Sequence, residues 1–65
     1  MEGTINKLND RGFGFITPEG EDKDVFFHRT DLVGSEFNDL NEGDKVTFDK
    51  EDSEKGPKAV KVTLV

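Results

Sequence analysis

Hydrophobic and polar residues alternate along most of this 65-residue chain, and no segment keeps a helical period. Because successive side chains of a strand point to opposite sides, such alternation predicts β-strands rather than helices. Glycine, proline and short polar runs separate the alternating segments. The pattern therefore predicts five strands, over residues 2–8, 11–17, 23–28, 44–50 and 58–65.

The alternation also predicts which side of each strand faces a core. The first strand is irregular, because Ile5 and Leu8 fall on opposite sides unless a β-bulge intervenes. The other inward positions are expected at Val25 and Phe27 in the third strand, Val46 and Phe48 in the fourth, and Val60, Val62 and Leu64 in the fifth. The corresponding outward positions are Phe26 and His28 in the third strand and Ala59, Lys61 and Thr63 in the fifth.

The longest connection, residues 29–43, joins the third strand to the fourth. We expect it to hold one short helical turn around Leu32-Val33, capped by Thr30 or Asp31. Five short strands must close on themselves to hide their edges and enclose a core. The expected fold class is therefore all-β, a five-stranded antiparallel β-barrel in a single domain over residues 1–65.

Charge is distributed unevenly along the chain. The 15 acidic residues outnumber the 9 lysines and arginines, which gives a net charge of −6. The acidic residues gather in two loops, 19–24 and 49–55, where solvated hairpin connections are expected. This balance argues against a protein that holds nucleic acid mainly through its phosphates.

Aromatic residues form the most informative pattern. Residues 11–16 read Arg-Gly-Phe-Gly-Phe-Ile and residues 25–29 read Val-Phe-Phe-His-Arg. If these two strands pair, one contiguous outer patch is formed by Phe13, Phe15, Phe26 and His28. A glycine at position 14 would let the inner side of a tightly curved barrel close. Flat rings on a sheet suit the stacking of unpaired bases, although the same rings could instead be ordinary core or dock a protein partner.

The whole chain resembles a bacterial-type cold-shock protein, the form with a single cold-shock domain. Residues 11–16 resemble the first ribonucleoprotein motif of that family, and residues 25–28 resemble the second. The resemblance continues, in order and at family spacing, through Gly34 to Leu40, Glu42-Gly43, Val46-Thr47-Phe48 and Lys55-Gly56-Pro57-Lys58-Ala59. The family has the oligonucleotide/oligosaccharide-binding (OB) fold and binds single-stranded RNA and DNA.

The resemblance implies a set of nucleic-acid-binding residues. Base stacking is implied for Phe13, Phe15, Phe26 and His28, with Phe37 extending the aromatic surface. Backbone attraction is expected from Lys7, Arg11, Arg29 and Lys58. Two features depart from the family: Lys7 and Leu8 align with a tryptophan followed by a phenylalanine, with the following turn one residue shorter, and Arg29 stands where an aromatic usually follows the histidine. We therefore expect weaker binding than in a typical member.

Other chemistry finds little support in the sequence. The single histidine and the absence of cysteine argue against a zinc site, and no catalytic constellation or cofactor motif is present. The sequence predicts a cytoplasmic, non-enzymatic RNA chaperone, active as a monomer on pyrimidine-rich single strands, with no membrane partner and no cofactor. The alternative is a protein-interaction module that uses the same aromatic face.

Overall fold

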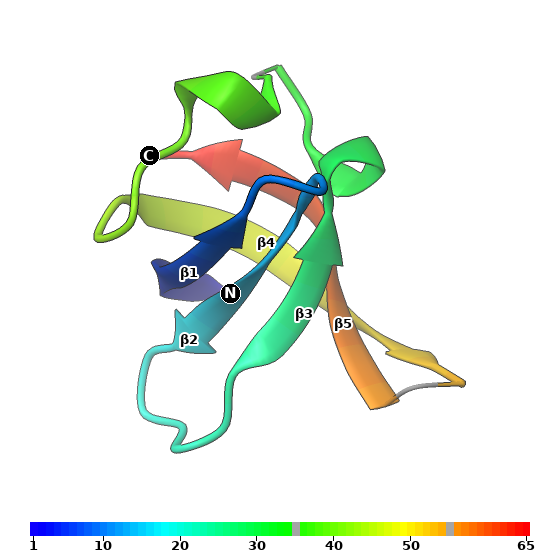
Figure 1. Cartoon of the computed structure of the whole chain (residues 1–65). Coiled ribbons are helices and arrows are strands. Elements are labelled where there is room, and N and C mark those ends of the chain that lie inside the picture. The colour runs from blue at the N-terminus through cyan, green and yellow to red at the C-terminus, as the bar shows by residue number, and fades with distance from the viewer. Residues whose placement is uncertain (35, 55) are drawn as a thin grey trace.

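The computed structural model describes residues 1–34, 36–54 and 56–65, and these form a closed β-barrel (Figure 1). Its strands are β1 (Glu2–Asn9), β2 (Phe13–Pro18), β3 (Val25–His28), β4 (Lys45–Ser53) and β5 (Gly56–Leu64). The predicted strands are thus confirmed, and the largest boundary error is at the end of β4, which continues three residues past position 50.

The strand order around the barrel is β1-β2-β3-β5-β4, and β4 returns to pair with β1. The all-β class and the five-stranded barrel are confirmed. One pairing differs from the rest, because β5 runs parallel to β3 and meets it where Phe26 lies beside Lys58. Parallel neighbours require a crossover connection, and here the long connection and β4 together provide it. The expectation of antiparallel pairing holds for β1–β2, β2–β3, β1–β4 and β4–β5.

The barrel interior is filled by aliphatic side chains around two buried rings, those of Phe27 and Phe48. The buried set is Ile5, Ile16, Val25, Phe27, Leu40, Val46, Phe48, Ala59 and Val62. This confirms the inward assignment of Val25 and Phe27 and therefore the outward one of their neighbours in β3. The core is complete without the rings of Phe13, Phe15 and Phe26, which are only half-buried.

A β-bulge in β1 resolves the irregular pattern of that strand. Ile5 pairs with Ile16, but the register has shifted by one residue where Lys7 pairs with Phe15. The extra residue restores the inward direction for Leu8, which is partly buried and packs against the core. The sequence left a bulge open as one way to place both residues inward, and the structure has that bulge.

A second bulge overturns part of the prediction for β5. Ala59 is fully buried, whereas Val60, predicted inward, is only half-buried. Thr47 pairs with Thr63 and Asp49 pairs with Val60, so β5 carries one residue more than β4 between these pairs. Lys61 absorbs the extra residue with a φ of 53°. The bulge reverses the alternation, and this is why Ala59 points inward.

The long connection contains two short 3₁₀ turns, η1 (Arg29–Asp31) and η2 (Phe37–Asp39). The turn expected around Leu32-Val33 is wrong, since η1 begins directly after β3 and its cap is His28. The His28 ring accepts a hydrogen bond from the Thr30 backbone N–H, and the His28 N–H donates to the Asp31 carboxylate. Among the residues described, no helix has the length and hydrophobicity that crossing a membrane would require.

Candidate nucleic-acid interface

Three phenylalanine rings and a histidine lie together on the outside of β2 and β3. Phe13 pairs with His28 and Phe15 pairs with Phe26, so all four side chains share one side of the hairpin. The ring centroids are 6.4 Å apart for Phe13–Phe15, 5.7 Å for Phe13–Phe26 and 6.0 Å for Phe15–Phe26. We call these four residues the ring face. The contiguous patch predicted from the sequence is confirmed as a geometric arrangement.

Gly14 allows the ring face to form over a tightly closed barrel. It lies between Phe13 and Phe15 and points inward, where a Cβ would come within 2.5 Å of the Lys7 carbonyl oxygen and 2.9 Å of the Phe27 ring. Neither contact is tolerable for a real side chain, and one of the two groups is backbone. The glycine therefore lets β1 and the Phe27 ring approach β2 closely.

Two lysines stand in line with the Phe15–Phe26 pair of the ring face, one on each side, and form a row across the sheet. Lys7 of β1 lies opposite Phe15, and Lys58 of β5 lies beside Phe26. The row therefore reads lysine, phenylalanine, phenylalanine, lysine across four strands. The bulge in β1 keeps the exposed Lys7 side chain outward while Leu8 turns to the core. The structure thus brings both predicted lysines to the edges of the ring face.

Lys58 already has an anionic partner. Its Nζ lies 3.4 Å from one carboxylate oxygen of Asp31, and these side chains are 30% and 11% exposed. The other oxygen of Asp31 accepts the backbone N–H of His28 at 3.0 Å. Asp31 thus fixes a lysine and the end of β3 at once. No local sequence pattern predicts this pair, because the two residues lie far apart in the chain.

The same turn holds the His28 ring in place. The Thr30 backbone N–H can only donate, so the Nδ1 atom of His28, 3.3 Å away, is the acceptor. The Thr30 hydroxyl lies 3.1 Å from the same nitrogen. A neutral His28 with Nδ1 accepting carries its proton on Nε2. The half-buried ring is therefore fixed beside Phe13 with a donor on its other nitrogen.

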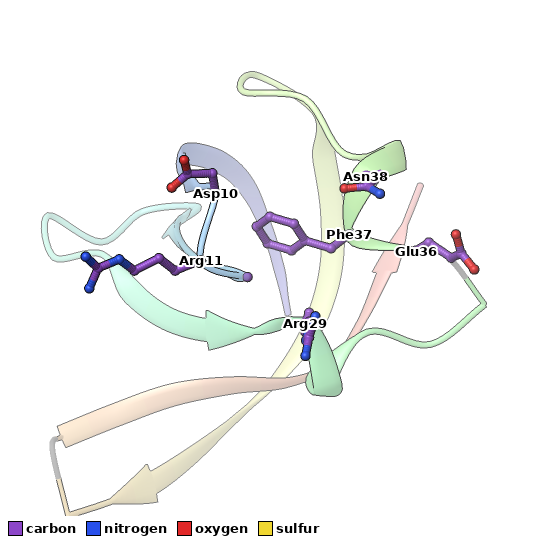
Figure 2. A pocket seen from close by; sticks show the side chains of 7 residues that line it. Asp10, Arg11, Arg29, Glu36, Phe37 and Asn38 are labelled. Atoms are coloured by element: carbon purple, nitrogen blue, oxygen red, sulfur yellow. The ribbon is translucent and has the colours of Figure 1, made fainter.

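Phe37 does not join the ring face. Its half-buried ring packs on the core ring of Phe27, with centroids 6.2 Å apart, and it pairs with no ring of the ring face among the described residues. Instead it borders a hollow of about 440 Å³ beyond the ends of β2 and β3. The lining residues are Asp10, Arg11, Gly12, Arg29, Glu36, Phe37 and Asn38. Figure 2 shows the Phe37 ring between Asp10 and Arg29, while the Arg11 side chain points away from it.

An acidic residue that the charge pattern predicts in a solvated loop lies beside the ring face. Asp24 accepts hydrogen bonds from the Thr17 hydroxyl at 2.6 Å and from the Asn6 side-chain amide at 2.7 Å. Thr17 shares its side of β2 with the ring-face residues. The two hydrogen bonds, that of Thr17 first, hold the pKa of Asp24 below 3.8. No local pattern reveals this contact, because the β1 bulge is what presents Asn6.

The described residues hold no group of three histidine, cysteine, aspartate or glutamate side chains placed to bind a metal ion. What the structure does present is a closed five-stranded barrel with rings on the outer side of one hairpin. That combination defines an OB-type barrel with an aromatic face.

Comparison with known proteins identifies the family of this barrel. The sequence matches the family described as the 'Cold-shock' DNA-binding domain over residues 1–65. Cold shock-like protein CspG of Escherichia coli K12 is 48% identical over 66 residues, covering 100% of this chain and 94% of CspG. Cold shock-like protein CspC of the same strain is 44% identical, covering 100% of this chain and 96% of CspC. The chain belongs to the cold-shock domain family.

A solved structure supports the same assignment. Drosophila Unr CSD456 superimposes with a TM-score of 0.81 at 28% sequence identity, over 98% of this chain and 26% of that one. The resemblance read from the two motifs is therefore confirmed at the level of family and fold.

Proposed function

We propose that this protein binds single-stranded RNA and DNA by stacking bases on Phe13, Phe15 and Phe26, with His28 beside Phe13 at the end of the hairpin. The observation that carries the proposal is the ring face itself, three rings within 5.7–6.4 Å of one another on the outside of a cold-shock barrel. Half-exposed rings that a complete core does not need are typical of a binding surface.

The magnitude of stacking is sufficient for useful affinity. Each base stacked on an aromatic side chain contributes about 1–3 kcal/mol. Three phenylalanines therefore supply about 3–9 kcal/mol, against the roughly 8 kcal/mol that a micromolar dissociation constant represents. Stacking on these rings can account for binding in this range without a strongly basic surface.

Electrostatic attraction contributes less than stacking in this proposal. Lys7, Arg11 and Arg29 border the ring face or its end, but the net charge of the protein is −6. Lys58 is already paired with Asp31. We therefore expect few phosphate contacts and a shallow dependence of affinity on salt.

The biological role that follows is that of an RNA chaperone without catalysis. A protein that binds unpaired bases and not paired ones shifts a weak hairpin toward its open form by mass action. No ATP and no cofactor are required. We propose that the protein acts this way as a monomeric single domain in the cytoplasm, and that the stacked bases are mainly pyrimidines.

The experiment that tests the proposal compares alanine variants of the ring face. Phe15→Ala and Phe26→Ala should each weaken binding of a heptathymidylate, dT7, about 5- to 150-fold, which corresponds to 1–3 kcal/mol per base. Circular dichroism should show an intact fold. The matched control is Val33→Ala, since Val33 is 51% exposed and lies outside the ring face.

Two outcomes would contradict the proposal. Unchanged affinity in both variants would show that bases do not stack there. Absence of saturable binding by the unaltered protein would favour the protein-interaction alternative, in which the same rings dock a partner.

A further inference from the structure

The hollow beside Phe37 continues directly from the ring face. Phe13 and His28 form the last pair of the hairpin, and the next two residues, Gly12 and Arg29, are joined by a hydrogen bond from the Arg29 N–H to the Gly12 carbonyl at 2.8 Å. Both of these residues line the hollow. A single strand stacked on the ring face and continuing past His28 would therefore enter the hollow next.

Arg29 is held in position at this entrance by a glycine. The Arg29 Cδ lies 3.0 Å, and its Cγ 3.5 Å, from where a Cβ of residue 12 would be. Gly12 also has a φ of +92°, which side chains rarely adopt. The stem of Arg29 thus packs over the bare backbone of the turn. This contact places the stem against the turn, while Arg29 as a whole is exposed.

The guanidinium of Arg29 is available to a ligand. It takes part in none of the ion pairs found among residues 1–34, 36–54 and 56–65. Its side-chain donors make no hydrogen bond within that part of the chain either. A planar, forked donor of this kind matches two adjacent acceptors in one plane.

The other groups of the hollow favour a base over a phosphate. Asp10 and Glu36 place two carboxylates on its wall, which balance the two arginines, so the hollow offers no excess of positive charge to an anion. The Phe37 ring offers a flat apolar surface. The volume of the hollow, about 440 Å³, lies within the range of small-ligand pockets. Stacking surface, donor fork and carboxylate acceptors together match the edges of a nucleobase.

We propose that this hollow binds one guanine of the single strand, stacked on Phe37, with Arg29 donating to O6 and N7. The proposal rests on the proposed function above. Guanine presents two adjacent acceptors, O6 and N7, to which arginine donates in bidentate fashion, and its N1–H and amino group are donors that a wall carboxylate can accept. Adenine offers an amino donor beside N7, and thymine offers only O4 on that edge, so neither satisfies the fork.

The experiment measures binding of dT7 and of seven heptamers in which a single dG replaces each thymidine in turn. One position at one end should bind about 5- to 150-fold more tightly than dT7, the discrimination expected for a bidentate pair. Replacing that guanine with 7-deazaguanine, which lacks N7, should remove most of the gain. Inosine, which lacks the amino group, tests the carboxylate side separately.

Two arginine variants provide the matched comparison. Arg29→Gln should abolish the ratio of affinities between the preferred dG heptamer and dT7. Arg11→Gln removes an equal charge from the same hollow and should leave that ratio in place, because its side chain points away from Phe37 (Figure 2). The ratio, rather than either affinity alone, is the readout.

Several results would overturn the inference without affecting the proposed function. These are equal affinity for all eight heptamers, equal gains at every dG position, a ratio that survives Arg29→Gln, or a gain produced by a 5′-phosphate instead of guanine. Failure of dT7 itself to bind would refute the proposed function, and with it the inference.

Discussion

The pairing of Lys58 with Asp31 leads to a prediction about the salt dependence of binding. One Asp31 oxygen lies 3.4 Å from Lys58 Nζ while the other accepts the His28 N–H at 3.0 Å. Asp31→Asn keeps an oxygen for the His28 N–H, so the η1 turn should persist. It removes the charge that neutralises Lys58. The lysine, which lies at the edge of the ring face beside Phe26, then becomes free to attract a phosphate.

The magnitude follows from counterion release. Each phosphate of a single strand that a protein neutralises changes the slope of log binding constant against log salt by about −0.7. One additional contact therefore makes the loss of affinity between roughly 50 and 200 mM salt about 2.6-fold larger. The variant should also bind more tightly than the unaltered protein at the lower salt concentration. Because the pair is partly exposed, its loss should cost at most about 1 kcal/mol of stability.

The assay is fluorescence anisotropy of labelled dT7 at four salt concentrations, with thermal unfolding to check the fold. Lys58→Gln is the control, and it should leave the slope of the unaltered protein unchanged, since Lys58 is already neutralised there. An unchanged slope in Asp31→Asn would refute this reasoning. A shallower slope in Lys58→Gln alone would show that Lys58 reaches phosphate despite its ion pair.

Three further predictions concern single residues. Phe27→Ala, which empties a fully buried site, should cost about 3–5 kcal/mol in a urea titration, and a cost near 1 kcal/mol would contradict the core assignment. Lys7→Trp should tighten oligonucleotide binding about 5- to 150-fold, monitored by tryptophan fluorescence, because Lys7 lies opposite Phe15; no gain would contradict its family alignment. The hydrogen bonds that Asp24 accepts hold the pKa of this residue below 3.8. The ionised Asp24 therefore stabilises the folded state above that pH, and this stabilisation is lost as pH falls through the lowered pKa. Melting temperatures measured from pH 2 to 6 should therefore fall less steeply in Asp24→Asn, and equal slopes would contradict the effect.

The strands and the ring face could be predicted because both depend on local alternation. Phe26 and Phe27 are adjacent and must point to opposite sides, so one ring had to lie outside the core. The pairing of Phe13 with His28 and of Phe15 with Phe26 then follows from a hairpin between neighbouring strands.

The features that the sequence failed to predict depend on contacts between distant residues. Alternation assumes a strict period of two, and the bulge at Lys61 breaks that period, so Ala59 and Val60 exchanged sides. The place of Phe37 depends on how the long connection folds back against Phe27. The neutralisation of Lys58 likewise needs the parallel closure of β3 and β5. None of these contacts leaves a local pattern.

The most direct test of the account is a binding isotherm of the unaltered protein with dT7 and with a uridine heptamer, each at two salt concentrations. Stacking on the ring face predicts saturable binding to both, with a slope of log affinity against log salt no steeper than about −2, as expected for at most three phosphate contacts. Absence of saturation, or a slope much steeper than this, would contradict the claim that an acidic cold-shock barrel binds single strands chiefly through its rings.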